Sequence, residues 1–149
     1  MCIRDRPIAV GQIAPTVFAR DGDQDVEIGF GDRETILYVL SPVCRWCMRN
    51  TPNMVELFAR RSKEFRFVGL SLESDGLDQY LAKNSLPFKV YVAKAETLAA
   101  YGLGATPSTI VIDSGGKIAR KFNGAFLKSK PTVEEYFKLT LPGIREGGL

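Results

Sequence analysis

Two cysteines separated by two residues, Cys44 and Cys47 in the segment CRWC, carry the most reactive chemistry in this sequence. Cysteines at this spacing in the first turn of a helix can bring their sulfurs within disulfide distance. The first would lie at the helix N-terminus, where unpaired N–H groups and the helix dipole favour an anion. Such cysteines have pKa values of roughly 3.5–7.5, so we expect a nucleophilic thiolate near neutral pH. Arg45 should favour the same ionisation, because a nearby cation stabilises a charged sulfur.

The composition excludes several other kinds of chemistry. The chain has 149 residues, no histidine and three cysteines, which excludes Ser-His-Asp and Cys-His catalysis and leaves too few soft ligands for a zinc site. We therefore expect no metal and no cofactor. A net charge of +3 is too small to indicate a nucleic-acid partner. The spacing of the cysteines alone leaves open an inert, buried pair.

The long uncharged stretches and the two ends of the chain are considered next for membrane-spanning and targeting segments. The uncharged stretches 35–44 and 97–112 are unsuited to a spanning helix, the second being broken by glycines and a proline. Residues 1–6 lack the pattern of a secretory signal and resemble a peptide translated from sequencing-adapter bases. We expect residues 1–9 to be non-native or disordered, with any native signal or anchor missing, residues 10–140 to form one domain, and residues 141–149 to be a tail.

The elements that would position the cysteines are a strand and a helix. The β-branched and aromatic run Thr35–Leu40 predicts a central strand covered on both faces. A period of 3.6 over Arg45–Arg61 predicts a helix, with a kink expected near residues 48–52 because Pro52 lies inside it. The residues expected on its buried face are Met54, Val55, Leu57 and Phe58, and those expected to face water are Arg49, Asn53, Glu56 and Arg60.

Further elements alternate along the chain. The patterns predict an N-terminal hairpin turning at 21–23, strands over 65–72 and 89–92, helices over 76–84 and 96–101, a hairpin over 108–122 and a closing helix over 132–139. Ser74 and Asp75 are the expected caps of the helix over 76–84. Strands alternating with helices predict an α/β fold with a mixed central sheet flanked by helices.

With its motifs in this order, the sequence resembles thioredoxin-fold proteins, nearest to the TlpA-like and ResA-like thiol-disulfide oxidoreductases of bacteria. The resemblance rests on Val10, Gly11, Gln12, Pro15, the strand over 35–40, Cys44, Cys47, Pro52, Thr106, Pro107 and the turn at 112–118. It implies a single thioredoxin-like domain over 10–140, with an N-terminal β-hairpin and a strand-helix insertion at 72–98. It also implies a cis Thr106–Pro107 bond that faces the cysteines, with Thr106 contacting an extended substrate peptide.

The resemblance further implies a reaction and its partners. Cys44 would attack a substrate disulfide, a mixed disulfide would form, and Cys47 would resolve it, or the sequence would run in reverse for oxidation. The partners would be protein thiols or disulfides, among them apocytochrome or copper-site cysteines, together with an upstream electron donor. We expect a monomer in the periplasm or cell envelope, touching the membrane only through a missing anchor, with the cytoplasm as the alternative location.

Three departures from the family pattern bear on the site. Trp46 stands where the family usually has proline, and it is either a platform for a partner or packed over the helix start. Asn50 stands where TlpA-like proteins often have glutamate, and the strand over 35–40 lacks the aspartate of plain thioredoxins. The proton acceptor for Cys47 is therefore unassigned, with Glu73 or water as candidates.

Two other functions fit parts of the pattern. Ser41, three residues before Cys44, suggests a peroxiredoxin-like thiol peroxidase, although Leu37 occupies the place of the proline that such enzymes need. Two thiolates also suit Cu(I), which suggests a non-enzymatic thioredoxin-fold binding module or copper chaperone, with Met48 adjacent.

Overall fold

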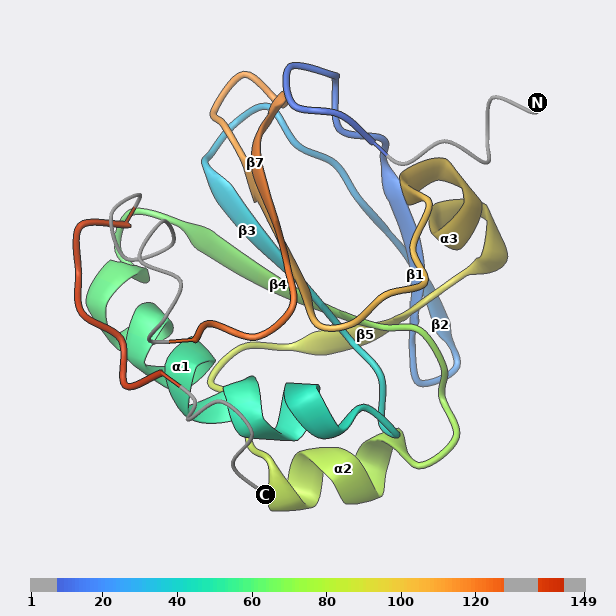
Figure 1. Ribbon diagram of the computed structural model, residues 1–149. Coiled ribbons are helices and arrows are strands. Elements are labelled where there is room, and N and C mark those ends of the chain that lie inside the picture. The colour runs from blue at the N-terminus through green and yellow to red at the C-terminus, as the bar shows by residue number, and fades with distance from the viewer. Residues whose placement is uncertain (1–7, 128–136, 144–149) are drawn as a thin grey trace.

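A computed structural model of the chain describes residues 8–127 and 137–143. In this part of the chain, three helices pack against one seven-stranded sheet (Figure 1). The elements in chain order are β1 (Val17–Asp21), β2 (Gln24–Ile28), β3 (Thr35–Leu40), α1 (Arg45–Arg61), β4 (Arg66–Ser71), α2 (Leu77–Lys83), β5 (Val90–Ala93), α3 (Ala95–Tyr101), β6 (Ser108–Ile112) and β7 (Ile118–Asn123).

The sheet is mixed, as predicted, with strand order β2-β1-β5-β4-β3-β6-β7. β3 pairs in parallel with β4 and antiparallel with β6, and it lies inside the sheet with all six residues buried. The predicted hairpins are the antiparallel pairs β1–β2 and β6–β7. β5 extends the sheet between β4 and β1. Because β3 is parallel to β4, the carboxyl ends of both strands reach the same edge, where α1 begins.

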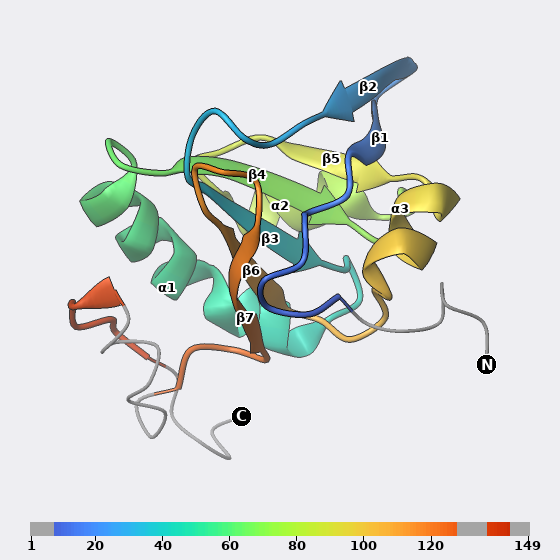
Figure 2. The same ribbon diagram turned by 90° about the horizontal axis from the view of Figure 1, so that it is seen from above.

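Alternate residues of β3 enter two separate cores, one on each face of the sheet. Figure 2 shows α1 and α3 on opposite sides of this sheet. Ile36, Tyr38 and Leu40 join the core beneath α1 and α2. The intervening Leu37 and Val39 join the core on the opposite face, which includes Tyr101 of α3. This alternation follows from the two-residue period of a strand. It places the Tyr38 side chain on the face that carries α1.

Two predictions about the faces of α1 are wrong. Asn53 is buried, with 0% of its surface exposed, whereas Val55 is 41% exposed. The buried face of α1 also includes Cys47 and Asn50. It is therefore rotated about the helix axis relative to the face predicted from the apolar residues alone. Asn53 is tolerated inside because its amide is fully hydrogen-bonded. The helix continues through Pro52, and the kink stays a prediction.

The remaining helices differ from the sequence expectation in detail. The N-cap of α2 is Gly76 in the left-handed conformation, so the expected capping by Ser74 or Asp75 side chains is wrong. α3 ends at Gly102 as predicted, with the φ of 62° that glycine adopts without strain. Most of the helix expected over 132–139 falls outside the described residues, as do residues 1–7. No helix in the described ranges is long and apolar enough to cross a bilayer.

Candidate active site

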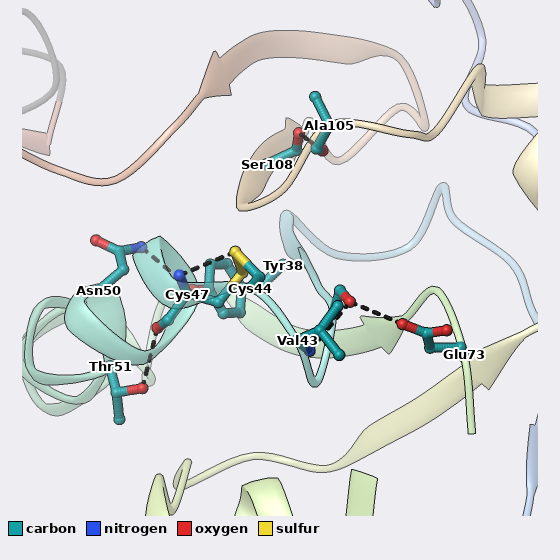
Figure 3. Close-up of a disulfide and its surroundings, with 10 residues drawn as sticks. Tyr38, Val43, Cys44, Cys47, Asn50, Thr51, Glu73, Ala105 and Ser108 are labelled. Atoms are coloured by element: carbon teal, nitrogen blue, oxygen red, sulfur yellow. Dashed lines mark hydrogen bonds between the residues drawn. A yellow bond between two sulfur atoms is a disulfide. The ribbon is translucent and has the colours of Figure 1, made fainter. Parts of the chain in front are cut away.

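The two cysteines lie at the junction of β3 and α1 and form a disulfide (Figure 3). Their Cα atoms are 5.2 Å apart. Cys44 is the N-cap residue of α1, and its Sγ accepts a hydrogen bond of 3.0 Å from the backbone N–H of Cys47. The sulfur therefore occupies the place of a capping oxygen, where backbone donors and the helix dipole stabilise negative charge.

The two cysteines differ in their access to solvent. Cys47 is completely buried in the core beneath α1, whereas Cys44 is only partly buried and packs against the edge of that core. A disulfide partner must approach a sulfur along its S–S axis, which requires an exposed sulfur. Cys44 is thus the more accessible residue of the pair.

The residues between the cysteines face outward. Arg45 is exposed at the first turn of α1. Trp46 is 41% exposed, and the guanidinium of Arg49 lies 5.4 Å from the centre of its ring. This distance fits a cation–π contact, which holds the indole on the surface beside the disulfide.

The loop before β6 lies opposite the cysteines, as Figure 3 shows by the positions of Ala105 and Ser108. Between them, the Thr106–Pro107 peptide bond is cis. The backbone carbonyl of Pro107 accepts a 2.8 Å hydrogen bond from Gly124, and the Ser108 hydroxyl donates to the carbonyl of Ala105 at 2.9 Å. These bonds fix the loop from both sides. Pro107 is buried, while Thr106 is partly exposed.

A cavity of about 160 Å³ joins this loop to the start of α1. The residues that line it are Trp46, Thr106, Gly124, Ala125 and Leu127. The structure therefore brings Trp46 and Thr106, both singled out from the sequence, to one surface. Gly124, Ala125 and Leu127 were missed, because the segment after β7 carries no motif that would mark it.

Asn50 belongs to a buried polar network rather than to the rim of the site. Its Nδ2 donates to the Tyr38 hydroxyl at 3.3 Å, and its Oδ1 accepts from the backbone N–H of Phe126 at 2.9 Å and from Asn53 Nδ2 at 3.0 Å. Sequence reasoning missed Tyr38 and Asn53 as partners. Asparagines one turn apart in the middle of an amphipathic helix were the available signal.

Glu73 lies on the Cys44 side of the site. Its carboxylate accepts a 3.1 Å hydrogen bond from the Ser41 hydroxyl, and the backbone carbonyl of Ser41 accepts from Cys44 N–H at 3.1 Å. Within the described residues, no hydrogen bond joins Glu73 to either sulfur. The Ser41 hydroxyl also accepts from Val43 N–H, so it is engaged away from Cys44, which gives no support to the peroxidase alternative.

The described residues contain no cluster of three or more histidine, cysteine, aspartate or glutamate side chains that would hold a metal ion.

The sequence is similar to those of known proteins. The family model of the redoxins matches residues 9–139. The thiol-disulfide oxidoreductase ResA of Bacillus thuringiensis subsp. konkukian is 25% identical over 146 residues, covering 93% of this chain and 83% of that protein. ResA of Geobacillus thermodenitrificans is 25% identical over 127 residues, covering 81% and 73%.

The fold is also found among solved structures. A crystal structure described as a putative thiol:disulfide interchange protein DsbE from Chlorobium tepidum superposes with a TM-score of 0.74 and 23% identity, covering 88% of this chain and 96% of that one. StoA from Bacillus subtilis superposes with a TM-score of 0.65 and 17% identity, covering 84% and 98%. At these levels of sequence identity, the two similarities show the fold alone.

Proposed function

The chain belongs to the redoxin family and is a thiol-disulfide oxidoreductase, and we propose that Cys44 is its nucleophile and Cys47 its resolving cysteine. The observation that carries the assignment is the asymmetry of the disulfide at the start of α1. Cys44 is partly exposed, and its sulfur accepts a hydrogen bond from the backbone N–H of Cys47, whereas the Cys47 side chain is buried. The outer sulfur meets the partner, and the inner one attacks afterwards.

The proposed reaction balances as two exchange steps. The Cys44 thiolate attacks one sulfur of a partner disulfide, so that a mixed disulfide forms and the other partner sulfur leaves as a thiolate. Cys47 then attacks Cys44, closes the Cys44–Cys47 disulfide and releases the second partner thiolate. Two electrons pass from the enzyme to the partner. The reverse sequence oxidises a partner dithiol.

We propose that the partner chain lies across the cavity between Trp46 and Thr106. The exposed indole supplies an apolar surface, and the Thr106 backbone supplies hydrogen bonds to an extended segment. Pro107 shapes the loop that presents Thr106 and fills the space beneath it. Apolar contact and backbone pairing suit an unfolded or loop segment of a protein rather than a small thiol.

Three further side chains are proposed to tune the cysteines. Arg45 favours the Cys44 thiolate through its charge. Glu73, whose carboxylate accepts a hydrogen bond from Ser41, lies at the Cys44 end of the pair. Its negative charge there disfavours the Cys44 thiolate. Asn50 acts on the Cys47 end, through the buried network that contains Tyr38.

The resemblance to TlpA-like proteins supports the proposed setting. We propose a monomer in the periplasm or cell envelope that exchanges electrons with protein cysteines, including those of apocytochromes or copper sites, and with an upstream electron donor.

Trapping tests the assignment of the two cysteines. A Cys47→Ser variant should accumulate a mixed disulfide with a cysteine-containing protein substrate, because the resolving thiol is missing. A Cys44→Ser variant, the matched control, should trap none. Mass spectrometry of the trapped peptide identifies the bonded cysteine. Trapping by Cys44→Ser instead, or by neither variant, would overturn the proposal.

A further inference from the structure

A tyrosine hydroxyl lies buried on the inner side of the cysteine pair. Tyr38, in the middle of β3, is 1% exposed and belongs to the same core cluster as Cys47. Asn50 lies one helical turn after Cys47, so the two side chains are neighbours on the buried face of α1. The Asn50 amide donates a hydrogen bond of 3.3 Å to the Tyr38 hydroxyl (Figure 3). This bond places the hydroxyl beside the helical turn of α1 that runs from Cys47 to Asn50.

The orientation of this hydroxyl is fixed. The Asn50 Oδ1 is held by Phe126 N–H and Asn53 Nδ2, so its Nδ2 must point to Tyr38. The hydroxyl oxygen thus accepts from Asn50, and its own hydrogen is left to donate. No acceptor for that hydrogen is found among the described residues. A buried donor without an acceptor is costly, and a sulfur that ionises beside it would supply that acceptor.

The other state of the site is the reduced dithiol. Opening of the disulfide frees the Cys47 sulfur, which then needs a donor when it ionises to attack. β3 contains no acidic residue and Asn50 is a neutral amide, so neither of them supplies a carboxylate at this end of the pair. Resting on the function proposed above, we propose that Tyr38 is a further catalytic residue that donates its phenolic hydrogen bond to the Cys47 sulfur of the reduced protein, with Asn50 as its positioning residue.

The phenol acts as a hydrogen-bond donor and not as a base. Burial raises the pKa of Tyr38 above its ordinary value, so the hydroxyl keeps its proton at neutral pH. Tyr80, which faces the same core from α2, is also kept neutral by burial. Two charged side chains near the cysteine pair are engaged elsewhere: Arg45 is exposed to solvent, and Glu73, which follows β4, is bonded to Ser41.

The resolving step then balances without a protein base. The Cys47 thiol gives up its proton as its sulfur attacks Cys44, and the departing partner thiolate takes that proton up. Tyr38 neither gains nor loses a proton. Its hydrogen bond stabilises the charge that develops on Cys47, as donors aimed at developing charge do in other active sites. Closure of the disulfide removes that charge and leaves the hydroxyl as the structure shows it.

The test separates attack by Cys44 from resolution by Cys47. Reduced protein is mixed with 5,5′-dithiobis(2-nitrobenzoate) in a stopped-flow instrument. Attack by Cys44 releases one equivalent of thionitrobenzoate, and closure of the disulfide by Cys47 releases a second. In Tyr38→Phe the first phase should stay within about twofold of the wild type, and the second should slow by about tenfold, the loss expected for a hydrogen bond to a charged group. The pH midpoint of the second phase should rise.

A matched control distinguishes this effect from loss of stability. Tyr101→Phe removes another buried tyrosine hydroxyl, from the core on the opposite face of the sheet, where it bonds the Pro15 carbonyl. Both phases should be unchanged in that variant. A second phase at the wild-type rate in Tyr38→Phe would overturn the inference. A wild-type protein that releases no second equivalent would instead overturn the proposed function.

A second measurement avoids the mutation altogether. 3-Fluorotyrosine is incorporated at position 38 alone, and at position 101 in a separate sample, in the otherwise unchanged protein. In the reduced protein, the fluorine resonance at 38 should titrate together with the ionisation of Cys47, and the resonance at 101 should not. A resonance at 38 that ignores the cysteines would contradict the inference, whatever the stability of Tyr38→Phe.

Discussion

The buried amide of Asn53 donates to the backbone carbonyl of Phe126 at 2.9 Å, joining the middle of α1 to the segment that follows β7. The Oδ1 of the same side chain accepts from the backbone N–H of Gly143 at 2.7 Å. One side chain therefore holds two irregular segments against the helix. Because Ala125 and Leu127 flank Phe126, this contact also positions one wall of the cavity between Trp46 and Thr106.

Loss of this amide should destabilise the fold. We expect Asn53→Ala to lower the free energy of unfolding by about 2–4 kcal/mol, because the Phe126 carbonyl and the Gly143 N–H lose their partner. Urea denaturation measures the change. Val55→Ala, on the exposed side of the same helix, should change stability by less than about 0.5 kcal/mol. Equal losses in the two variants would show that the Asn53 contacts contribute nothing.

Trp46 should matter to protein partners and not to small disulfides. We expect Trp46→Ala to raise the KM for a protein or peptide disulfide by roughly fivefold to tenfold, since about 1–1.4 kcal/mol of apolar contact is lost. Met48→Ala is the matched control, because Met48 is on the same helix and also 41% exposed but does not line the cavity. Steady-state kinetics with both substrate sizes provides the measurement. An equal effect of the two variants would contradict a docking role for Trp46.

Arg45 should increase the reactivity of Cys44 by charge alone. Arg45→Gln should slow alkylation of reduced Cys44 at pH 7 by about twofold to fivefold, the size of a partly screened charge effect. The difference should shrink as salt is added. Arg60→Gln, at the far end of α1, should have no effect on this rate. A salt-independent loss in Arg45→Gln would indicate a steric rather than an electrostatic role.

Alkaline pH should destabilise the protein through its buried tyrosines. Burial raises the pKa of Tyr38, Tyr80 and Tyr101 above the ordinary 10.0, so the native state holds these protons more tightly than the unfolded state. The stability they contribute is complete below pH 10 and is lost as the pH rises above it, at up to about 1.4 kcal/mol per pH unit for each tyrosine. Urea titrations from pH 9 to 11 measure the slope. Tyr101→Phe should remove one of the three contributions, and an unchanged slope in that variant would refute the account.

The fold could be predicted well because its signals are local. The apolar run of β3, the helical period of α1 and the glycine that ends α3 each specify their element within a few residues. The cysteine pair was recognised for the same reason, since its chemistry depends on spacing and on the helix start. Neighbouring elements then follow from the rules for packing helices on a mixed sheet.

The rest of the site depends on contacts between distant segments. Asn53 looks like a surface residue of an amphipathic helix until the chain after β7 arrives to accept its hydrogen bond. Tyr38 looks like an ordinary core aromatic until Asn50 is placed against its hydroxyl. The capping of α2 failed for a related reason, because the backbone at Gly76 adopts a left-handed turn that replaces the side-chain cap.

Selective alkylation of the reduced protein tests the central assignment most directly. Iodoacetamide is added at pH 7, and the labelled peptides are followed in time by mass spectrometry. Cys44 should be modified faster than a free cysteine peptide, because its sulfur is accessible and lies among the first N–H groups of α1, and Cys47 should be modified only after unfolding. Preferential labelling of Cys47, or slow labelling of both, would contradict the roles assigned to the two cysteines.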